Sequence, residues 1–286
     1  MVKYFKKVLC IFMVILYFPV TMCYASADNE NDLVFPESFS QDNFSFNKTT
    51  GEEYLKISEF LTDKNIMQYF YGIPFSFKNK EDALLYGLGR SNDGSAIRTT
   101  KEDAVSYTIR CEEQNNEIIG LVSFGYPSTG NVTTYGSSGE VVNMHTVVDM
   151  NVSYFIGNDF RGHRYGFRAV KALIDKFYKL NEESEAELMF SFECASTNEA
   201  SLKTIKMLGA TQLSDDFIDE YRYNKRLVSD TMCEVEVKQL RDGKEFNFSY
   251  CLPKNILHDC LMNLPDGECW TVKEYKFYYE KNLDEQ

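Results

Sequence analysis

Residues 158–170 are the part of the sequence best suited to binding a charged ligand. They read NDFRGHRYGFRAV, a polar turn with basic residues, closed by Gly166, that opens into an apolar-periodic segment. A helix N-terminus offers unpaired N–H groups and a positive dipole end, and Arg161 adds a cation, so this turn can cradle a phosphate. The alternative is a solvated basic loop that caps a helix. The turn has neither the GK[ST] sequence nor the glycine spacing of a Walker-type loop, which excludes that kind of nucleotide site.

The segments around this turn alternate between strand and helix patterns. The apolar-rich stretch 141–157 precedes the turn and predicts a strand, and 166–180 follows it with apolar residues at helical spacing. The other predicted elements are a strand over 53–60, a helix over 62–72 with Thr62 as N-cap, a short helix over 79–90, two strands within 104–127, a strand over 186–195, a helix over 198–210 stopped by Gly209, a hairpin within 233–252, and a strand or helix over 270–281.

This order of elements predicts an α/β fold. Helices would flank a mixed, mostly antiparallel central sheet, with one parallel βαβ step around the turn at 158–166. Such sheets bind ligands in the crevice beyond the C-terminal ends of their strands. The turn lies at such a place.

The first 27 residues have the pattern of a signal peptide. Lys3, Lys6 and Lys7 precede an apolar run over 8–20 that is short for a bilayer span, and small residues around Ala27 form a cleavage pattern. We therefore expect cleavage after Ala27 and export, either secreted or periplasmic. The alternative is an uncleaved membrane anchor, and only then is a membrane a partner.

The chain is strongly acidic. Its formal net charge is -13, and loss of the first 27 residues, which hold three lysines and no acid, makes it -16. A chain this acidic is repelled by phosphate backbones, which argues against nucleic acid as a partner and favours a cationic amine.

The cysteines permit disulfides but do not indicate a metal site. Six of the eight lie beyond the first 27 residues, and four of those six lie in the C-terminal third, so a disulfide of unknown pairing is one expectation. Cys194 lies on an apolar strand pattern and is expected to be a buried thiol. No CxxC spacing or neighbouring histidine pair suggests zinc.

Three blocks of the sequence resemble the GNAT superfamily of N-acetyltransferases, in the branch that acetylates protein N-termini and small amines. VSYFIGNDFRGHRYGFRAVKALIDKFY resembles its motif A, in which a strand, "GYWI", a spacer and "RGKGYG/A" lead into a helix. STNEASLKTIKMLGA resembles a second signature, an Asn followed three residues later by Ser on a helix that ends in "LGF". NNEIIGLVSFG resembles the hairpin strand that carries "IG", and the blocks occur in the family's order over about 53–252.

The resemblance implies that acetyl-CoA is the co-substrate. The main chain of Phe155 and Ile156 would bond the pantetheine arm as an added strand would, Asn198 would bind the pantetheine or the reacting amide, and Ser201 would lie near the cofactor. The pyrophosphate would lie against the turn formed by Arg161, Gly162, His163, Arg164, Tyr165 and Gly166.

The sequence departs from the family's pattern at three positions. Arg164 stands where the turn has Gly, Ile205 stands where a Tyr general acid is frequent, and Asn151 stands at a frequently acidic position. Arg164 either covers the phosphates or fills the space they need.

The general base is not fixed by the resemblance. Acetyl transfer to an amine requires that a side chain, directly or through water, takes a proton from the ammonium. The candidates are Asp149 and Glu193, each on a predicted strand, with His145 third. The alternative for both carboxylates is a structural or surface role.

The sequence thus predicts an acetyl-CoA-dependent N-acetyltransferase that acts on a primary amine of a protein, peptide or small molecule. The alternative is a GNAT-fold binding module that has lost catalysis. The expected organisation is a signal peptide or anchor over 1–27, a linker or arm over 28–51, the acetyltransferase-like domain over 52–252 and a C-terminal extension over 253–286.

Overall fold

The computed structural model describes residues 33–69, 75–83, 104–125, 127–135, 141–182, 187–213, 218–241, 243–265 and 267–279. The elements up to the turn at 158–166 are β1 (Ser38–Gln41), β2 (Phe44–Lys48), α2 (Gly51–Leu61), α3 (Lys64–Met67), β3 (Ala104–Cys111), β4 (Glu117–Gly125), β5 (Ser128–Tyr135) and β6 (Val141–Ile156). Those after it are α5 (Tyr165–Leu180), β7 (Glu187–Ala195), α6 (Glu199–Leu208), β8 (Thr211–Gln212), β9 (Asp219–Leu227), β10 (Met232–Arg241), β11 (Lys244–Pro253), α7 (Asp259–Met262) and β12 (Cys269–Tyr279).

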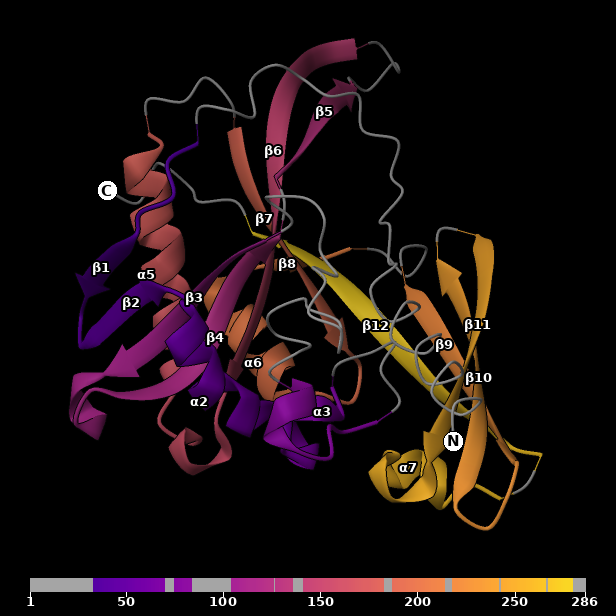
Figure 1. Cartoon of the computed structure of the whole chain (residues 1–286). Coiled ribbons are helices and arrows are strands. Elements are labelled where there is room, and N and C mark those ends of the chain that lie inside the picture. The colour runs from indigo at the N-terminus through magenta and orange to yellow at the C-terminus, as the bar shows by residue number, and fades with distance from the viewer. Residues whose placement is uncertain are drawn as a thin grey trace.

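The strands form one mixed sheet. Its order is β1-β2-β3-β4-β6-β7-β12-β9-β10-β11, with β5 paired to β6 and β8 paired to β12. Among the described pairs only β6–β7 is parallel, and α5 connects these two strands. Figure 1 shows β1–β4 at one side, β9–β11 at the other, and β12 running between them. The predicted fold class is confirmed.

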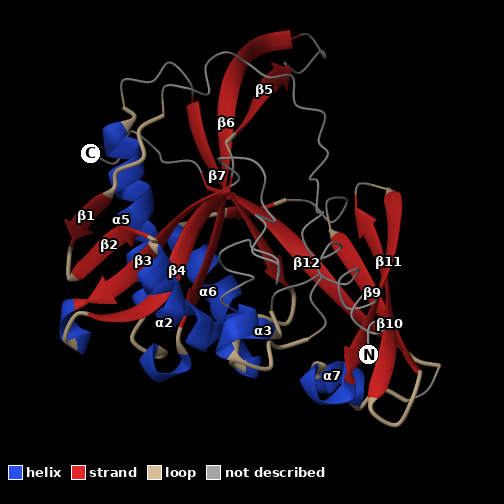
Figure 2. Ribbon diagram, in the orientation of Figure 1, coloured by secondary structure: helices blue, strands red, loops and turns tan. Residues whose placement is uncertain are grey.

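Helices pack against both faces of this sheet (Figure 2). On one face, α5 and α6 contribute Val170, Ile174, Phe177 and Ile205 to a core cluster with the inner faces of β3, β4, β6 and β7. On the other face, residues of α2, α3 and α7 form a second cluster with strands β9 to β12. Strands β6 and β7 contribute to both clusters, with Val152 and Phe192 in the first and Phe155 and Ala195 in the second.

The strand predicted over 53–60 is wrong, because this segment lies in helix α2. Thr50 and Glu53 form a capping box at its start, and the buried residues Ile57 and Leu61 recur at helical spacing. Thr62, the predicted N-cap of the next helix, is instead the C-cap of α2.

Part of the predicted linker over 28–51 belongs to the sheet. β1 and β2 form an antiparallel hairpin, and β2 pairs with β3. Phe44 and Phe46 are fully buried, and Phe39 stacks on Phe46 with ring centroids 4.5 Å apart. The alternating apolar residues of FSFNK explain this burial, and the Asn-rich and Ser-rich neighbours had obscured it.

The C-terminal segment, expected to be an extension over 253–286, contributes strand β12 to the sheet. β12 lies between β7 and β9 and pairs antiparallel with both. Strand β9 was not predicted, because charged residues alternate with its buried tyrosines Tyr221 and Tyr223.

The described cysteines are all free thiols, three of them buried. Cys194 is among the buried ones, as expected, and burial raises the pKa of its thiol to about 11. The predicted signal peptide, residues 1–27, lies outside the described residues. In the part of the chain that is described, no helix is both long and apolar enough to cross a membrane.

Candidate active site

The parallel strands β6 and β7 pair over only part of their length. Their pairing ends at Asn151 opposite Ser191. Beyond this point β6 continues to Ile156 alongside β4, and β7 continues to Ala195 alongside β12. The facing edges of the two strands therefore part toward their C-terminal ends, with no described strand between them. We call this opening the β6–β7 cleft.

The backbone of Ile156 faces the cleft, whereas that of Phe155 does not. The carbonyl of Phe155 lies against β4, since a Cβ atom added to Gly120 would be 2.2 Å from that oxygen. Backbone groups of successive strand residues point to opposite edges, so Tyr154 and Ile156 direct theirs toward the cleft. Of the two residues predicted to bond the pantetheine arm, Ile156 directs its backbone groups toward the cleft, as Tyr154 also does, and Phe155 directs its own toward β4.

A tight turn connects the open end of β6 to helix α5. It starts with a short 3₁₀ helix over Asn158–Phe160, after which Arg161 folds back and donates from Nε to the carbonyl of Ile156 at 3.3 Å. Gly162 follows with φ at +89° and open space around it, so it serves the backbone conformation. No side chain caps the first turn of α5, which leaves its N–H groups directed at the cleft mouth.

The turn accommodates Arg164, where the family's pattern has Gly, without a change of backbone conformation. Its φ of +58° and ψ of +21° lie in the left-handed region, where Gly is favoured. The chain therefore keeps the backbone of the glycine turn at a cost of about 1–2 kcal/mol. The side chain of Arg164 is exposed and makes no side-chain hydrogen bond or ion pair with another described residue, so it does not fill the interior of the turn.

Tyr165 and Gly166 fix the first turn of α5 against the sheet. The Tyr165 hydroxyl donates to Glu113 Oε2 and accepts from Gln114 Nε2, both at 3.1 Å, and its ring stacks with that of His163. The side chain of Tyr165 is buried, so only its backbone N–H remains for a ligand. A Cβ atom on Gly166 would lie 3.3 Å from the Tyr154 ring, which shows how closely the helix approaches β6.

The second signature supplies a polar group beside the cleft. Asn198 caps α6, and its side-chain oxygen accepts from the Ser201 N–H at 3.2 Å. The Ser201 hydroxyl lies 3.1 Å from that of Tyr154, so this pair bridges β6 and α6. Burial raises the pKa of Tyr154 to about 12, which keeps the phenol protonated. The sequence did not single out Tyr154, although its place in the "GYWI" block was the available signal.

Ile205 takes no part in the chemistry. Its side chain is aliphatic and fully buried in the core between α6 and the sheet. The Tyr154 hydroxyl is bonded to Ser201, which lies one turn of α6 before Ile205.

Asp149 has the properties of a general base. It lies on β6 near the point where the cleft opens, and one of its carboxylate oxygens is buried without a hydrogen-bond partner. Burial raises its pKa to about 6, partly offset by the hydroxyl of Ser191 and reinforced by the charge of Glu193. A carboxylate with this pKa is ionised at neutral pH and still basic enough to accept a proton.

Glu193, in contrast, is tied into an ion-pair network. Both of its oxygens accept from Arg241 Nη2, at 3.1 and 3.2 Å, and the same arginine binds Asp219. Lys276 Nζ lies 3.3 Å from Asp219 Oδ1 and adds a second ion pair to that carboxylate. This pairing favours the structural role for Glu193 over that of a base.

His145 was the third candidate for the general base. The side chain of His145 lies outside the described ones, while its backbone pairs with Val132 of β5. Among the described residues, no group of three or more His, Cys, Asp or Glu side chains is placed to hold a metal ion.

Several solved structures are similar to this chain at low sequence identity. An acetyltransferase of the GNAT family from Bacillus anthracis is 12% identical, with 85% of this chain and 98% of that one covered and a TM-score of 0.45. Spermidine N-acetyltransferase from Vibrio cholerae, solved with CoA and spermine, is 9% identical, with 83% and 95% covered and a TM-score of 0.43. The Salmonella typhimurium enzyme that modifies the N-terminal serine of ribosomal protein L7/L12 is 11% identical, with 85% and 97% covered and a TM-score of 0.45.

The family of the chain is assigned from its sequence. No curated protein matches the chain. The sequence model of the Acetyltransferase (GNAT) domain matches residues 46–211, which is more than half of the chain and spans the β6–β7 cleft, the turn and α6. The chain belongs to the GNAT acetyltransferase family.

Proposed function

We propose that this protein is an acetyl-CoA-dependent N-acetyltransferase that acts on a primary amine. The observation that carries the proposal is the β6–β7 cleft with the uncapped N-terminus of α5 at its open end. This arrangement suits a ligand with an extended amide-bearing arm and an anionic end, which describes coenzyme A.

The residues around the cleft fit the parts of coenzyme A. Its pantetheine arm carries amides that can bond the backbone of Tyr154 and Ile156, and Arg161 would release the Ile156 carbonyl to it. Its pyrophosphate would lie against the N–H groups over 161–166, with Arg161 and Arg164 as cations. When bound, acetyl-CoA supplies an acetyl group activated as a thioester.

Asp149 would accept the proton of the acceptor ammonium. Loss of that proton creates the free amine, which attacks the acetyl carbon. The C–S bond then breaks, and the departing thiolate takes up the second proton of the amine. Asp149 lies near the point where the strands part, and its raised pKa suits proton transfer near neutral pH.

Tyr154 would donate a hydrogen bond to the departing sulfur. Its hydroxyl is held by Ser201 beside the cleft, and its raised pKa keeps the proton in place. This assignment gives the chain a phenol despite Ile205, which argues against the alternative of a binding module that has lost catalysis.

The proposal extends to the class of acceptor and to the location of the protein. An acidic chain favours a cationic acceptor, such as a polyamine or a basic peptide. Relatives of the fold include one named for spermidine and one for a ribosomal protein N-terminus, which is consistent with this class. If residues 1–27 direct export, the protein must bind acetyl-CoA outside the cytosol of the cell that makes it. Mass spectrometry of the mature N-terminus tests whether residues 1–27 are removed.

The test is thiol release from acetyl-CoA with a panel of amines. We expect turnover with at least one cationic amine, and a loss of about 10²-fold or more in kcat for Asp149→Asn. The matched control is Asp230→Asn, which removes the same charge from an exposed loop and should leave kcat unchanged. Binding of acetyl-CoA without turnover of any amine would favour the inactive module instead.

A further inference from the structure

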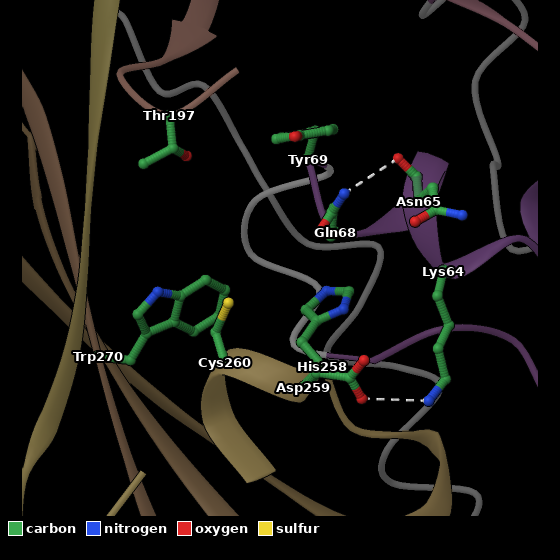
Figure 3. Close-up of a pocket in the computed structure, with 9 residues that line it drawn as sticks. All are labelled: Lys64, Asn65, Gln68, Tyr69, Thr197, His258, Asp259, Cys260 and Trp270. Carbon is green, nitrogen blue, oxygen red and sulfur yellow. Dashed lines mark hydrogen bonds and ion pairs between the residues drawn. The ribbon is translucent and has the colours of Figure 1, made fainter. Parts of the chain in front are cut away.

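A second cavity lies beside the turn that connects β7 to α6. Its volume is about 200 Å³, and Figure 3 shows side chains arranged around a central space. They come from α3 and the residues after it, from the β7–α6 turn, from α7 and from β12; they are Lys64, Asn65, Gln68, Tyr69, Thr197, His258, Asp259, Cys260 and Trp270. His258, Asp259, Cys260 and Trp270 lie beyond the segment that the family model matches.

The aromatic wall of this cavity is held in place before any ligand binds. Trp270 packs on Tyr223 with ring centroids 4.9 Å apart and meets the ring of His258 edge-on at 6.0 Å. His258 is only 3% exposed. A ligand would therefore pay little ordering entropy on the protein side when it contacts Trp270.

The rim of the cavity already holds a primary ammonium group. Lys64 Nζ lies 3.3 Å from Asp259 Oδ1, and the two side chains are 52% and 75% exposed. Ion pairs this exposed contribute little to stability, so another cation can replace Lys64 on Asp259 at low cost. Figure 3 shows this pair at the edge of the same space that Tyr69 and Trp270 border.

We propose that this cavity binds an alkylammonium group of the acceptor, with the cation against Trp270 and Tyr69 and on the carboxylate of Asp259. Aromatic rings attract cations through their negative faces. An anionic ligand would instead meet Asp259 and a chain with a net charge of -13. The inference rests on the proposed function, because it makes this cavity the acceptor subsite.

The position of the cavity relative to the cleft supports this role. Thr197 lines the cavity and directly precedes Asn198, the cap of α6 beside the cleft. Ser196 donates from its N–H to the carbonyl of Lys273 at 2.8 Å, which fixes this turn on β12. The cavity and the cleft thus share the β7–α6 turn, and an acceptor longer than a single amine can contact both.

Trp270 makes the test direct, because it is the only tryptophan of the 286 residues. The full chain is titrated, without acetyl-CoA, with 1,4-diaminobutane and with the neutral analogue 1,4-butanediol, and tryptophan emission is recorded. We expect a saturable change with the diamine and none with the diol. An emission that stays unchanged with the diamine overturns the proposal.

Two variants with opposite expected effects locate the contact. Asp259→Asn should weaken diamine binding about two- to fivefold, and Lys64→Met, which frees Asp259, should strengthen it by a similar factor. The matched controls are Glu37→Gln and Lys48→Met, which break a distant exposed ion pair with the same charge changes and should leave binding unaltered. Equal effects of test and control variants would show that net charge, and not the cavity, governs binding.

The outcome is separable from that of the proposed function. A saturable emission change without acetyl transfer to any amine supports the cavity and contradicts the enzyme. Acetyl transfer to the diamine with a KM that Asp259→Asn leaves unchanged contradicts the cavity and supports the enzyme. If both hold, Asp259→Asn raises the KM for the diamine and leaves kcat near the parent value.

Discussion

At the scale of the residue, Asp149 and Glu193 show how environment separates two carboxylates. Both lie on strands that border the β6–β7 cleft, and the sequence predicted both as candidates for the general base. Arg241 engages Glu193, whereas Asp149 keeps a buried oxygen without a hydrogen bond and a raised pKa. The distinction depends on Arg241, which is 48 positions from Glu193 in the chain, so the sequence near either carboxylate could not reveal it.

The pKa of Asp149 makes a prediction about activity. Because the carboxylate form is the base, kcat/KM should fall as the pH drops through about 6, the folded pKa of Asp149. Asp149→Asn should abolish this acid limb along with most of the rate. A pH–rate profile of the parent and the variant checks this. An unchanged acid limb in Asp149→Asn would assign the base to another group.

The backbone of Arg164 makes a prediction about binding and stability together. Arg164→Gly relieves the left-handed strain but gains unfolded-state entropy, so the midpoint of thermal unfolding should change little. Because the guanidinium is exposed and not inside the turn, the same change should weaken acetyl-CoA binding severalfold by loss of one cation. Tighter binding by Arg164→Gly would mean that the arginine obstructs the phosphate.

At the scale of the element, the cleft depends on the close pairing of β4 with β6. A Cβ atom on Gly120 would lie 2.2 Å from the Phe155 carbonyl, a clash with backbone that no rotamer can relieve. Gly120→Ala should therefore cost at least about 2 kcal/mol of unfolding free energy, measured by urea denaturation. Gly125→Ala on the same strand is the control, since its nearest contact is 3.2 Å from the Asn151 side chain and should cost less. Equal losses of unfolding free energy would show that the contact of Gly120 with the Phe155 carbonyl is not the tighter constraint.

The elements differ in how far the sequence could predict them. Strand β6, the turn, α5, β7 and α6 carry strong periodicity and caps, and they were predicted with their order. The segment over 53–60 has the alternating pattern of a strand, but it forms helix α2. The capping box at Thr50 and Glu53 and the helical spacing of Ile57 and Leu61 explain this. The placement of β12 between β7 and β9 could not be predicted, because strand order depends on long-range pairing and not on local pattern.

The same limit applies to the site. The turn and Asn198 could be named from motifs, since their function lies in local backbone geometry and a cap. Tyr154 and the orientation of the Phe155 carbonyl could not be predicted in this way. They depend on the register of β6 with β4 and on the contact of Tyr154 with Ser201 of α6. The cavity around Trp270 required contacts between residues about 200 positions apart, as the Lys64–Asp259 pair illustrates.

At the scale of the whole molecule, a network of charged side chains connects the C-terminal strands to β7 and should make stability depend on pH. Its members are Glu193, Asp219, Arg241, Glu274 and Lys276. Glu274 of β12 is 7% exposed, and burial together with the charges of Glu193 and Asp219 raises its pKa, against the opposing effect of Arg241 and Lys276. A carboxyl whose folded pKa is raised stabilises the protein less as the pH rises above its unfolded pKa of 4.5.

Replacement of Glu274 tests this linkage. Glu274→Gln removes the buried charge, so it should raise the free energy of unfolding at pH 8 and leave it nearly unchanged at pH 4. The exposed Glu268→Gln is the control and should show no such pH dependence. Denaturant titrations at both pH values decide, and a destabilised Glu274→Gln at pH 8 would mean that the ionised carboxylate is a net stabilising member of the network.

The measurement that tests the central claim most directly is a calorimetric titration of the protein with acetyl-CoA. The β6–β7 cleft and the turn predict one molecule bound per chain, and Arg161→Ala should weaken binding about tenfold or more through loss of a charge-assisted contact. Arg222→Ala, which removes an exposed arginine from β9, should bind as the parent does. Absence of binding, or equal binding by parent and Arg161→Ala, would contradict the account.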